Sequence, residues 1–230
     1  MQICVLDDAK GAAAYAAKHI AEAARRAVLE RGSCSLALSG GSTPGPTQSV
    51  LASENIPWAS VHIFQVDERA VPINSPQRNF ANIRNILLSR APIPEENVHP
   101  MPVDTADLDA GAKAYERELT NVLGSPAVFD LLHLGLGADG HTASLVPGDA
   151  SAARQTCDVT VSVPYEGTRR MTLTYPILNR ARTILWLVLG QDKAEMLQRL
   201  IAGDTSIPAG RIESSRAIVI ADKAAASLIG

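Results

Sequence analysis

The stretch Cys34-Ser-Leu-Ala-Leu-Ser-Gly-Gly-Ser-Thr-Pro44 decides the fold class of this chain. Its first half, residues 34–39, is an apolar run that predicts a buried strand. The strand leads directly into the turn residues Gly40 and Gly41, and Pro44 is well placed to open a helix. The stretch therefore predicts a strand, a tight turn and a helix in direct succession.

The same succession continues in both directions along the chain. Apolar, β-branched runs predict strands, and Ala-rich or amphipathic runs predict helices. Such repeated units predict an α/β fold, with one mostly parallel sheet and right-handed crossovers that place helices on both faces. Strands are predicted at 3–6, 61–66, 98–101, 129–134, 183–189 and 217–220, short β pieces at 159–163 and 171–174, and helices at 9–30, 79–88, 108–123, 193–201 and 221–228.

Length and composition favour a single domain over residues 1–230. A chain of 230 residues can bury one sizeable core. The hydrophobic fraction is 46% and the aromatic fraction only 4%, so aliphatic side chains must fill that core. The net charge of −3 provides no basic field for nucleic acid, whereas an anionic small molecule needs only a few local donors. We expect a small-molecule ligand and no nucleic-acid partner.

The N-terminus and the cysteines bear on the location of the protein. The first residues lack the basic and apolar regions of a secretion signal, and no apolar run approaches membrane-spanning length. Cys4, Cys34 and Cys157 are odd in number and widely spaced, which is typical of reduced thiols that pack in a cytosolic protein. We therefore predict a cytoplasmic protein with no membrane partner.

Three polar segments, residues 39–44, 67–69 and 135–148, follow predicted strands. In an open parallel sheet, ligands bind in the crevice beyond the carboxyl ends of the strands. We therefore expect the three segments to converge on one site.

The first segment has the composition of a phosphate-binding loop. Gly40 and Gly41 let the backbone approach a ligand, and Ser42 and Thr43 can donate hydroxyl hydrogen bonds. A glycine turn with an ordinary Ser or Thr helix cap explains the same residues equally well. The loop is not a P-loop, because no Gly-Lys-Ser/Thr follows.

The second segment is charged. Asp67, Glu68 and Arg69 could orient sugar hydroxyls or a catalytic water, although an isolated cluster of this kind is more often solvated surface. Arg78 precedes a predicted helix and could reach a phosphate with two parallel hydrogen bonds, although a surface arginine is the commoner case. On these residues alone, both alternatives stay open.

The third segment begins with Gly135-Leu-Gly-Ala-Asp-Gly140, which matches the G-x-G-x-x-G pattern of dinucleotide-binding turns. Such a turn should open a long helix, whereas the run that follows ends at Pro147-Gly148. What remains is Asp139 beside His141. An exposed imidazole at a glycine-rich strand end is a natural general base for activating water, and its neighbours favour that role over packing. No two His or Cys stand at ligand spacing on one element, so we expect no metal site.

Together these segments resemble the 6-phosphogluconolactonase family. The resemblance spans nearly the whole chain, and Asp139-Gly-His-Thr-Ala-Ser-Leu145 is its specific part, since the Gly-Gly-Ser-Thr-Pro loop is shared with related families. Val146 stands where we expect Phe, which is a conservative change. The matching pieces are Ser39-Gly-Gly-Ser-Thr-Pro44, Asp67-Glu-Arg69, Arg78-Asn-Phe80, Gly135 to Leu145, Thr172-Leu-Thr174, Leu178-Asn179, Gly190-Gln-Asp-Lys193 and Pro208-Ala-Gly-Arg211.

The resemblance implies a three-layer α/β/α sandwich of the sugar-phosphate isomerase type. It implies hydrolysis of 6-phospho-D-glucono-1,5-lactone to 6-phosphogluconate in the pentose phosphate pathway, without metal or organic cofactor, by a monomer or weak homodimer. By the same resemblance His141 is the general base, and Asp139 and Asp67 orient that histidine, the water or the sugar. The residues implied to hold the substrate phosphate are Gly41, Ser42, Thr43, Arg78 and Lys193, with Arg211 as a further neighbour.

The main alternative is glucosamine-6-phosphate deaminase, which shares the fold and the phosphate loop. In that family an Asn-Glu-Pro after the corresponding histidine supplies a carboxylate that assists ring opening. Here the segment reads Ser144-Leu-Val-Pro-Gly148, with no acid before Asp149, which favours hydrolysis. A sugar-phosphate sensor would need an attached DNA-binding module, for which we expect no room, and a nicotinamide dehydrogenase would need the missing long helix. Ser144 as a nucleophile lacks the G-x-S-x-G context.

Overall fold

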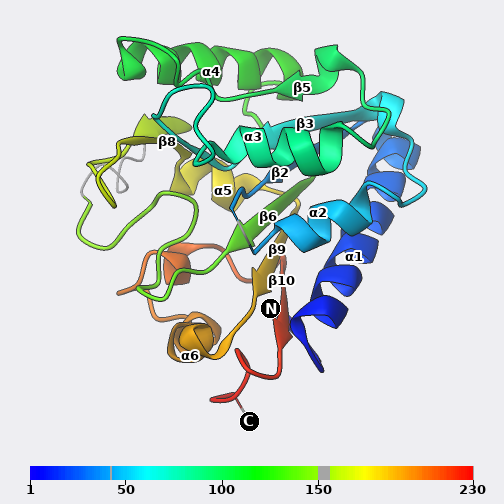
Figure 1. The fold of residues 1–230 in the computed structure, drawn as a ribbon, viewed down its shortest axis with the longest axis vertical. Coiled ribbons are helices and arrows are strands. Elements are labelled where there is room, and N and C mark those ends of the chain that lie inside the picture. The colour runs from blue at the N-terminus through cyan, green and yellow to red at the C-terminus, as the bar shows by residue number, and fades with distance from the viewer. Residues whose placement is uncertain (42, 150–155, 230) are drawn as a thin grey trace.

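A seven-stranded sheet forms the centre of the molecule in a computed structural model that describes residues 1–41, 43–149 and 156–229 (Figure 1). Its strand order is β1-β10-β9-β6-β2-β3-β5, and all neighbouring strands run parallel. The predicted α/β fold with a parallel sheet is confirmed. Its strands are β1 (Gln2–Leu6), β2 (Cys34–Leu38), β3 (Val61–Gln65), β5 (Val98–His99), β6 (Leu131–Gly135), β9 (Thr183–Val188) and β10 (Ala217–Asp222).

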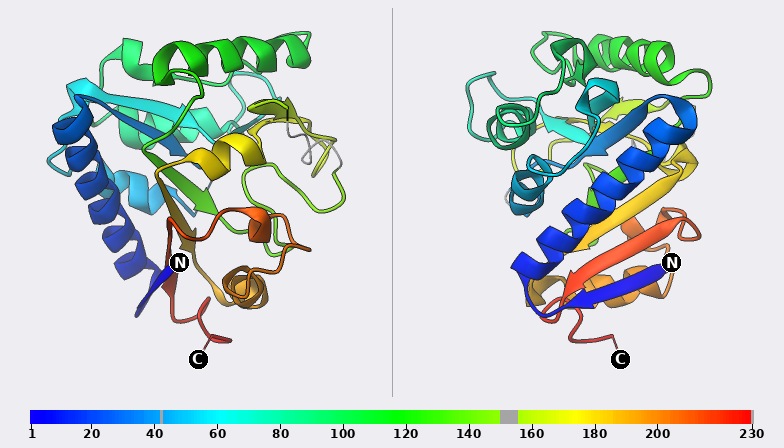
Figure 2. Two further views of the ribbon diagram at one scale, coloured as in Figure 1. Left: turned by 180° about the vertical axis from the view of Figure 1, so that it is seen from behind. Right: turned by 90° about the vertical axis from the view of Figure 1, so that its right-hand side faces the viewer.

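Helices cover both faces of this sheet, which gives the three expected layers (Figure 2). The first helix begins where the Asp8 carboxylate accepts the backbone N–H of Gly11 at 2.7 Å, and it ends at Gly32, whose φ of 81° suits glycine. On one face lie α1 (Ala9–Arg31), α2 (Gly45–Leu51) and α3 (Asn79–Ile83), which continues as a π-helical turn (Arg84–Leu88); on the other lie α4 (Leu108–Leu123), α5 (Tyr175–Arg180) and α6 (Ala194–Ile201).

The central strands are apolar at nearly every position because both of their faces are buried. In β9, Ile184 and Trp186 face the α4–α6 layer, whereas Leu185 and Leu187 face the α1–α3 layer. Successive side chains of a strand point to opposite faces, so a continuous apolar run feeds two hydrophobic clusters at once. Alanines dominate the buried side of α1 and let that helix lie close to the strands.

A second, antiparallel sheet of three strands lies beside the central one. The short β pieces predicted near 159–163 and 171–174 are its strands β7 (Val159–Val161) and β8 (Arg170–Leu173). Its third strand, β4, is Asp67–Arg69 itself, the segment expected to follow a strand, and Asp67 pairs with Thr172. The charged segment is therefore held rigidly at the end of β3.

The closing helix expected at 221–228 is wrong. β10 continues to Asp222, and turns follow it. The buried carboxylate of Asp222 accepts the N–H groups of Gly190 and Ala225, which binds the strand end to the neighbouring loop instead of starting a helix. Within the described residues, no helix is long and apolar enough to cross a membrane.

Candidate active site

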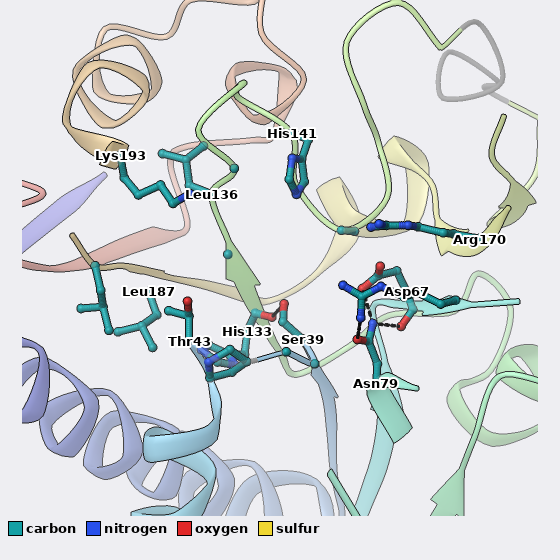
Figure 3. Close-up of a pocket in the computed structure, with 18 residues that line it drawn as sticks. Ser39, Thr43, Asp67, Asn79, His133, Leu136, His141, Arg170, Leu187 and Lys193 are labelled. Atoms are coloured by element: carbon teal, nitrogen blue, oxygen red, sulfur yellow. Dashed lines mark hydrogen bonds between the residues drawn. The ribbon is translucent and has the colours of Figure 1, made fainter. Parts of the chain in front are cut away.

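A pocket of about 250 Å³ opens at the carboxyl ends of β2, β3, β6 and β9 (Figure 3). The chain runs from β2 toward β3 on one side and later from β6 toward β9 on the other, so the pocket lies where the strand order reverses. All three polar segments that were expected to converge contribute to its wall. The lining residues are Ser39, Gly40, Gly41, Thr43, Pro44, Asp67, Arg69, Asn79, His133, Gly135, Leu136, Gly137, His141, Ala143, Arg170, Leu187, Leu189 and Lys193.

The glycine-rich turn after β6 shapes the backbone around His141. Gly137 and Gly140 close the turn through the bond from the Gly140 N–H to the Gly137 carbonyl at 3.0 Å. A Cβ at Gly137 would collide with Nδ1 of His141, and Gly140 has a φ of 83°. The glycines are therefore required by space and backbone angle, and the turn binds no nucleotide through a long helix.

His141 and Asp139 form a hydrogen-bonded pair. Nδ1 of His141 lies 2.6 Å from Oδ1 of Asp139, which also accepts the His141 backbone N–H at 3.1 Å. Burial opposes ionisation of Asp139, but the bonds from His141 and from the Tyr165 hydroxyl outweigh it and lower the pKa of this carboxyl. A carboxylate only accepts, so Nδ1 carries the proton and Nε2 keeps its lone pair.

Tyr165 is a member of the site that the sequence analysis missed. Its hydroxyl donates to Oδ2 of Asp139 at 3.1 Å, and its ring meets the His141 ring edge to face with centroids 5.4 Å apart. Burial and the Asp139 carboxylate both raise the pKa of Tyr165, so the phenol stays a donor. The tyrosine lies in a loop between β7 and β8, where nothing in the local sequence points to His141.

Asp67 occupies a different part of the pocket wall. Its Oδ2 accepts the Ser144 hydroxyl at 2.6 Å, and its Oδ1 accepts the Asn79 amide at 3.2 Å. Asp139, and not Asp67, is thus the carboxylate that contacts His141. Ser144 is buried and bonded to Asp67, so it does not form a pair with His141.

The loop after β2 approaches the pocket through its glycines. Gly40 lies so close to Asn79 that a Cβ would collide with that side chain, and Gly41 has a φ of 98°. Thr43 lines the pocket, while Ser42 lies outside the described residues. Lys193 lies across the pocket and forms an ion pair with Asp192 at 2.9 Å. Of the residues predicted to hold phosphate, the structure therefore brings Gly41, Thr43 and Lys193 together.

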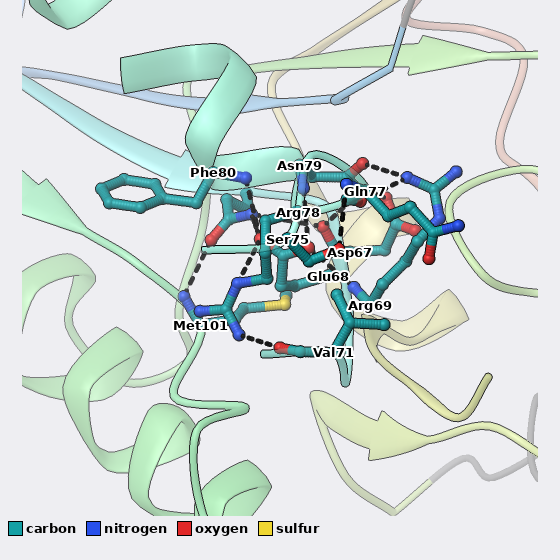
Figure 4. Close-up of polar contacts among 11 residues, drawn as sticks. Asp67, Glu68, Arg69, Val71, Ser75, Gln77, Arg78, Asn79, Phe80 and Met101 are labelled. Atoms are coloured by element: carbon teal, nitrogen blue, oxygen red, sulfur yellow. Dashed lines mark hydrogen bonds and ion pairs between the residues drawn. The ribbon is translucent and has the colours of Figure 1, made fainter. Parts of the chain in front are cut away.

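The structure places two predicted phosphate ligands, Arg78 and Arg211, outside this lining. The Arg78 guanidinium is buried, donates to the Val71 carbonyl at 3.1 Å and lies 3.7 Å from the Glu68 carboxylate (Figure 4). Arg211 donates to the Thr205 carbonyl at 2.9 Å. Each would have to leave these partners to bind a ligand in the pocket.

Arg69 and Arg170 supply the positive charge instead, together with Lys193. Arg69 belonged to the quoted charged segment, and its Nη1 donates to the Asn79 side chain at 2.9 Å. Arg170 is buried on β8, lies over the Tyr165 ring at 4.9 Å and bonds Glu166 at 2.8 Å. Only the pairing of β4 with β8 brings Arg170 to the site, so no local signal could have identified it.

No group of three His, Cys, Asp or Glu side chains suited to a metal ion exists among the residues that the structure describes. The pocket chemistry available from those residues is thus a base with a free nitrogen, a carboxylate behind it, and cationic side chains around an open space. Such a set suits the attack of water on an electrophilic carbon of an anionic substrate.

Comparison with known proteins identifies the family of this chain. Residues 7–220 match the family described as glucosamine-6-phosphate isomerases/6-phosphogluconolactonase. The chain is 41% identical over 181 residues to the 6-phosphogluconolactonase of Synechocystis sp., covering 77% of this chain and 75% of that protein. It is 35% identical over 229 residues to the 6-phosphogluconolactonase of Mycobacterium tuberculosis, covering 93% and 92%.

The solved structure of 6-phosphogluconolactonase from Thermotoga maritima has a TM-score of 0.87 to this chain at 33% identity, covering 96% of this chain and 98% of that one. The chain belongs to the glucosamine-6-phosphate isomerase/6-phosphogluconolactonase family of sugar-phosphate enzymes. Within this family its sequence places it among the 6-phosphogluconolactonases.

Proposed function

We propose that the chain hydrolyses 6-phospho-D-glucono-1,5-lactone to 6-phosphogluconate, with His141 as general base. The observation that supports this proposal is the 2.6 Å contact between His141 Nδ1 and the Asp139 carboxylate inside the pocket. Since Nδ1 faces the carboxylate, Nε2 is the nitrogen proposed to act as the base, and the side-chain hydrogen bond of His141 to a described residue is the one at Nδ1. Figure 3 shows the imidazole between Leu136 and Arg170.

In the first step, Nε2 takes a proton from a water molecule as the water oxygen attacks the lactone carbonyl carbon. The carbonyl oxygen becomes an oxyanion, and the pocket's buried Arg170 is the cationic donor proposed to stabilise it. In the second step, the bond from that carbon to the ring oxygen breaks. The ring oxygen leaves with the proton from the imidazolium, which restores the neutral base.

We propose that the substrate phosphate lies between the loop after β2 and Lys193, held by Gly41, Ser42, Thr43 and that lysine. Asp67 faces the same pocket, with both oxygens already hydrogen-bonded to protein donors, and is proposed to position a sugar hydroxyl or the water. Arg78 and Arg211 stay predicted phosphate ligands that would need to rearrange. Also proposed are a single domain over residues 1–230, a cytoplasmic location, and a monomer or weak homodimer.

Deamination of an amino sugar phosphate is the nearest alternative. It would require an acidic side chain in the pocket from the segment that follows His141. After His141 the first acid is Asp149. Its carboxylate accepts the Val163 N–H at 3.1 Å, and it lies outside the pocket lining. The carboxylate expected of a deaminase is therefore missing from the described pocket wall, which favours lactone hydrolysis.

The experiment follows the loss of freshly prepared 6-phosphogluconolactone in buffer, with the unmodified enzyme and with His141→Ala, because the lactone also hydrolyses unaided. We expect the enzyme to exceed buffer and His141→Ala to lose about 10²–10⁴-fold in kcat, the usual share of general-base help. The matched control is His19→Ala on α1, outside the pocket. An enzyme rate equal to buffer, or ammonia released from glucosamine 6-phosphate, contradicts the proposed activity.

A further inference from the structure

His133 is a buried histidine in the pocket wall that the proposed mechanism does not use. It lies on β6, in register with Leu38 of β2 and Leu185 of β9, and is only 1% exposed. Leu132 and Leu134 point to the α4–α6 layer, so strand alternation directs His133 toward the α1–α3 layer, beneath the loop after β2. It thus occupies the floor of the pocket.

Neither ring nitrogen of His133 has a hydrogen-bond partner in the described part of the chain. By contrast, His62 and His99 share a bond of 3.0 Å, and His141 bonds Asp139. A buried polar group without a partner costs stability, and an apolar side chain would pack in the same place without that cost. Packing alone therefore does not explain a histidine at this position, because leucine would fill the same space.

His133 lies against the loop after β2, which is the loop proposed to hold the substrate phosphate. Its carbonyl accepts both the N–H and the hydroxyl of Ser39, at 3.2 and 2.8 Å, so the loop is fastened directly to this part of β6. In Figure 3 the ring lies beside Thr43, and His141 lies on the far side of the pocket. Two more buried oxygens, of Thr47 and Gln48, lack partners among the described residues just past the loop. Of these three residues with unfilled hydrogen-bonding capacity, His133 is the one that lines the pocket.

We propose that His133 is a specificity-determining residue that donates an imidazole N–H to the phosphate group of the substrate. The inference rests on the proposed function and adds a second face to its phosphate subsite, opposite Lys193. Burial lowers the pKa of His133 to about 4, so the free protein holds a neutral imidazole with one N–H to donate. Lys193 supplies the positive charge that attracts the phosphate, and the N–H of His133 fixes the orientation of that group. Both interactions are absent with an unphosphorylated lactone, so the site favours phosphorylated lactones.

Kinetics with two substrates test this role. In His133→Leu we expect KM for 6-phosphogluconolactone to rise about tenfold, the scale of one hydrogen bond to a charged group, with kcat within about twofold of the unmodified enzyme. The rate with unphosphorylated glucono-1,5-lactone should not change. His133→Gln keeps an N–H donor and should recover part of the loss. The control is His62→Leu, which removes a histidine of β3 outside the pocket.

Imidazole NMR of the whole enzyme tests the contact independently of turnover. The His133 signal, assigned with His133→Gln, should shift with 6-phosphogluconate and with inorganic phosphate but not with gluconate. An unmoved signal at saturating product overturns the inference, as does an unchanged KM in a folded His133→Leu. Loss of thermal stability in that variant with KM unchanged would assign the residue a structural role instead. If no lactone is hydrolysed at all, the proposed function fails, and the phosphate titration still decides the contact.

Discussion

Two acidic clusters lie at strand ends of the same sheet, and they differ in what their hydrogen bonds serve. Glu68 is fully buried, and its carboxylate accepts backbone N–H groups of Arg69, Asn79 and Phe80 at 2.7 to 2.8 Å (Figure 4). The Asp139 side chain is 37% exposed and contacts the imidazole of His141 at its Nδ1. The Glu68 carboxylate, whose oxygens accept backbone N–H groups, holds a loop in shape. The Asp139 carboxylate instead orients a side chain that faces the pocket.

The largest expected effect is on activity, at the glycine-rich turn after β6 that carries Asp139 and His141. Asp139→Asn removes the charge behind His141 and allows the wrong tautomer, so we expect kcat to fall by about 10²–10⁴-fold. Stability in urea should change by less than about 1 kcal/mol, because the pair is partly exposed. Asp109→Asn, an exposed acid of α4, is the control. Full activity in Asp139→Asn would place Asp139 with the structural acids.

At Glu68, in contrast, the main effect is expected on stability. Glu68→Ala leaves Arg78 buried without its carboxylate and several N–H groups unpaired, so the free energy of unfolding should fall by about 3–5 kcal/mol. Urea unfolding measures this loss, with the exposed Glu96→Ala as control. A Glu68→Ala variant that is stable but inactive would contradict the structural role of Glu68 and would assign it a role in the reaction.

A third prediction extends the comparison to His133, a buried side chain whose ring nitrogens have no hydrogen-bond partner among the residues that the structure describes. The pKa of His133 is lowered to about 4, below the unfolded value near 6.5, so the unfolded chain takes up a proton first and the fold loses stability as pH falls from about 6.5 toward 4. Both His133→Leu and His133→Gln should therefore lose about 3 kcal/mol less between pH 7 and pH 4 than the unmodified enzyme. Urea unfolding at several pH values tests this, and parallel curves would contradict it.

The smallest effect is expected at Tyr165, which donates a hydrogen bond to Asp139 from the loop between β7 and β8. Tyr165→Phe removes one hydrogen bond to Asp139, so kcat should fall about fivefold, the equivalent of ~1 kcal/mol. The hydroxyl helps to lower the pKa of Asp139, so that pKa should rise in the variant and the acid limb of activity should move to higher pH. Carboxyl NMR titration measures the shift, with Tyr15→Phe on α1 as control.

Sequence reasoning predicted most of the strands and helices and the convergence of the three polar segments, because parallel strands end on one edge whatever their order. It also paired Asp139 with His141, which are neighbours in a short turn. It missed Tyr165 and Arg170, since each reaches the site only through the antiparallel sheet. For Arg78 it expected a surface or ligand-binding side chain, and the structure shows a buried partner of Glu68.

The amino-acid sequence by itself determined the α/β alternation and the glycine turn that presents His141, because both depend on contacts between residues close along the chain. Only the tertiary structure decided which cations face the pocket, and which histidine is buried beneath it with no hydrogen-bond partner among the described residues. Those properties depend on the register between strands far apart in the sequence, such as β4 with β8 and β6 with β2 and β9. The neighbours of a side chain across a sheet cannot be predicted from the residues next to it in the chain, because they depend on the register of the strands.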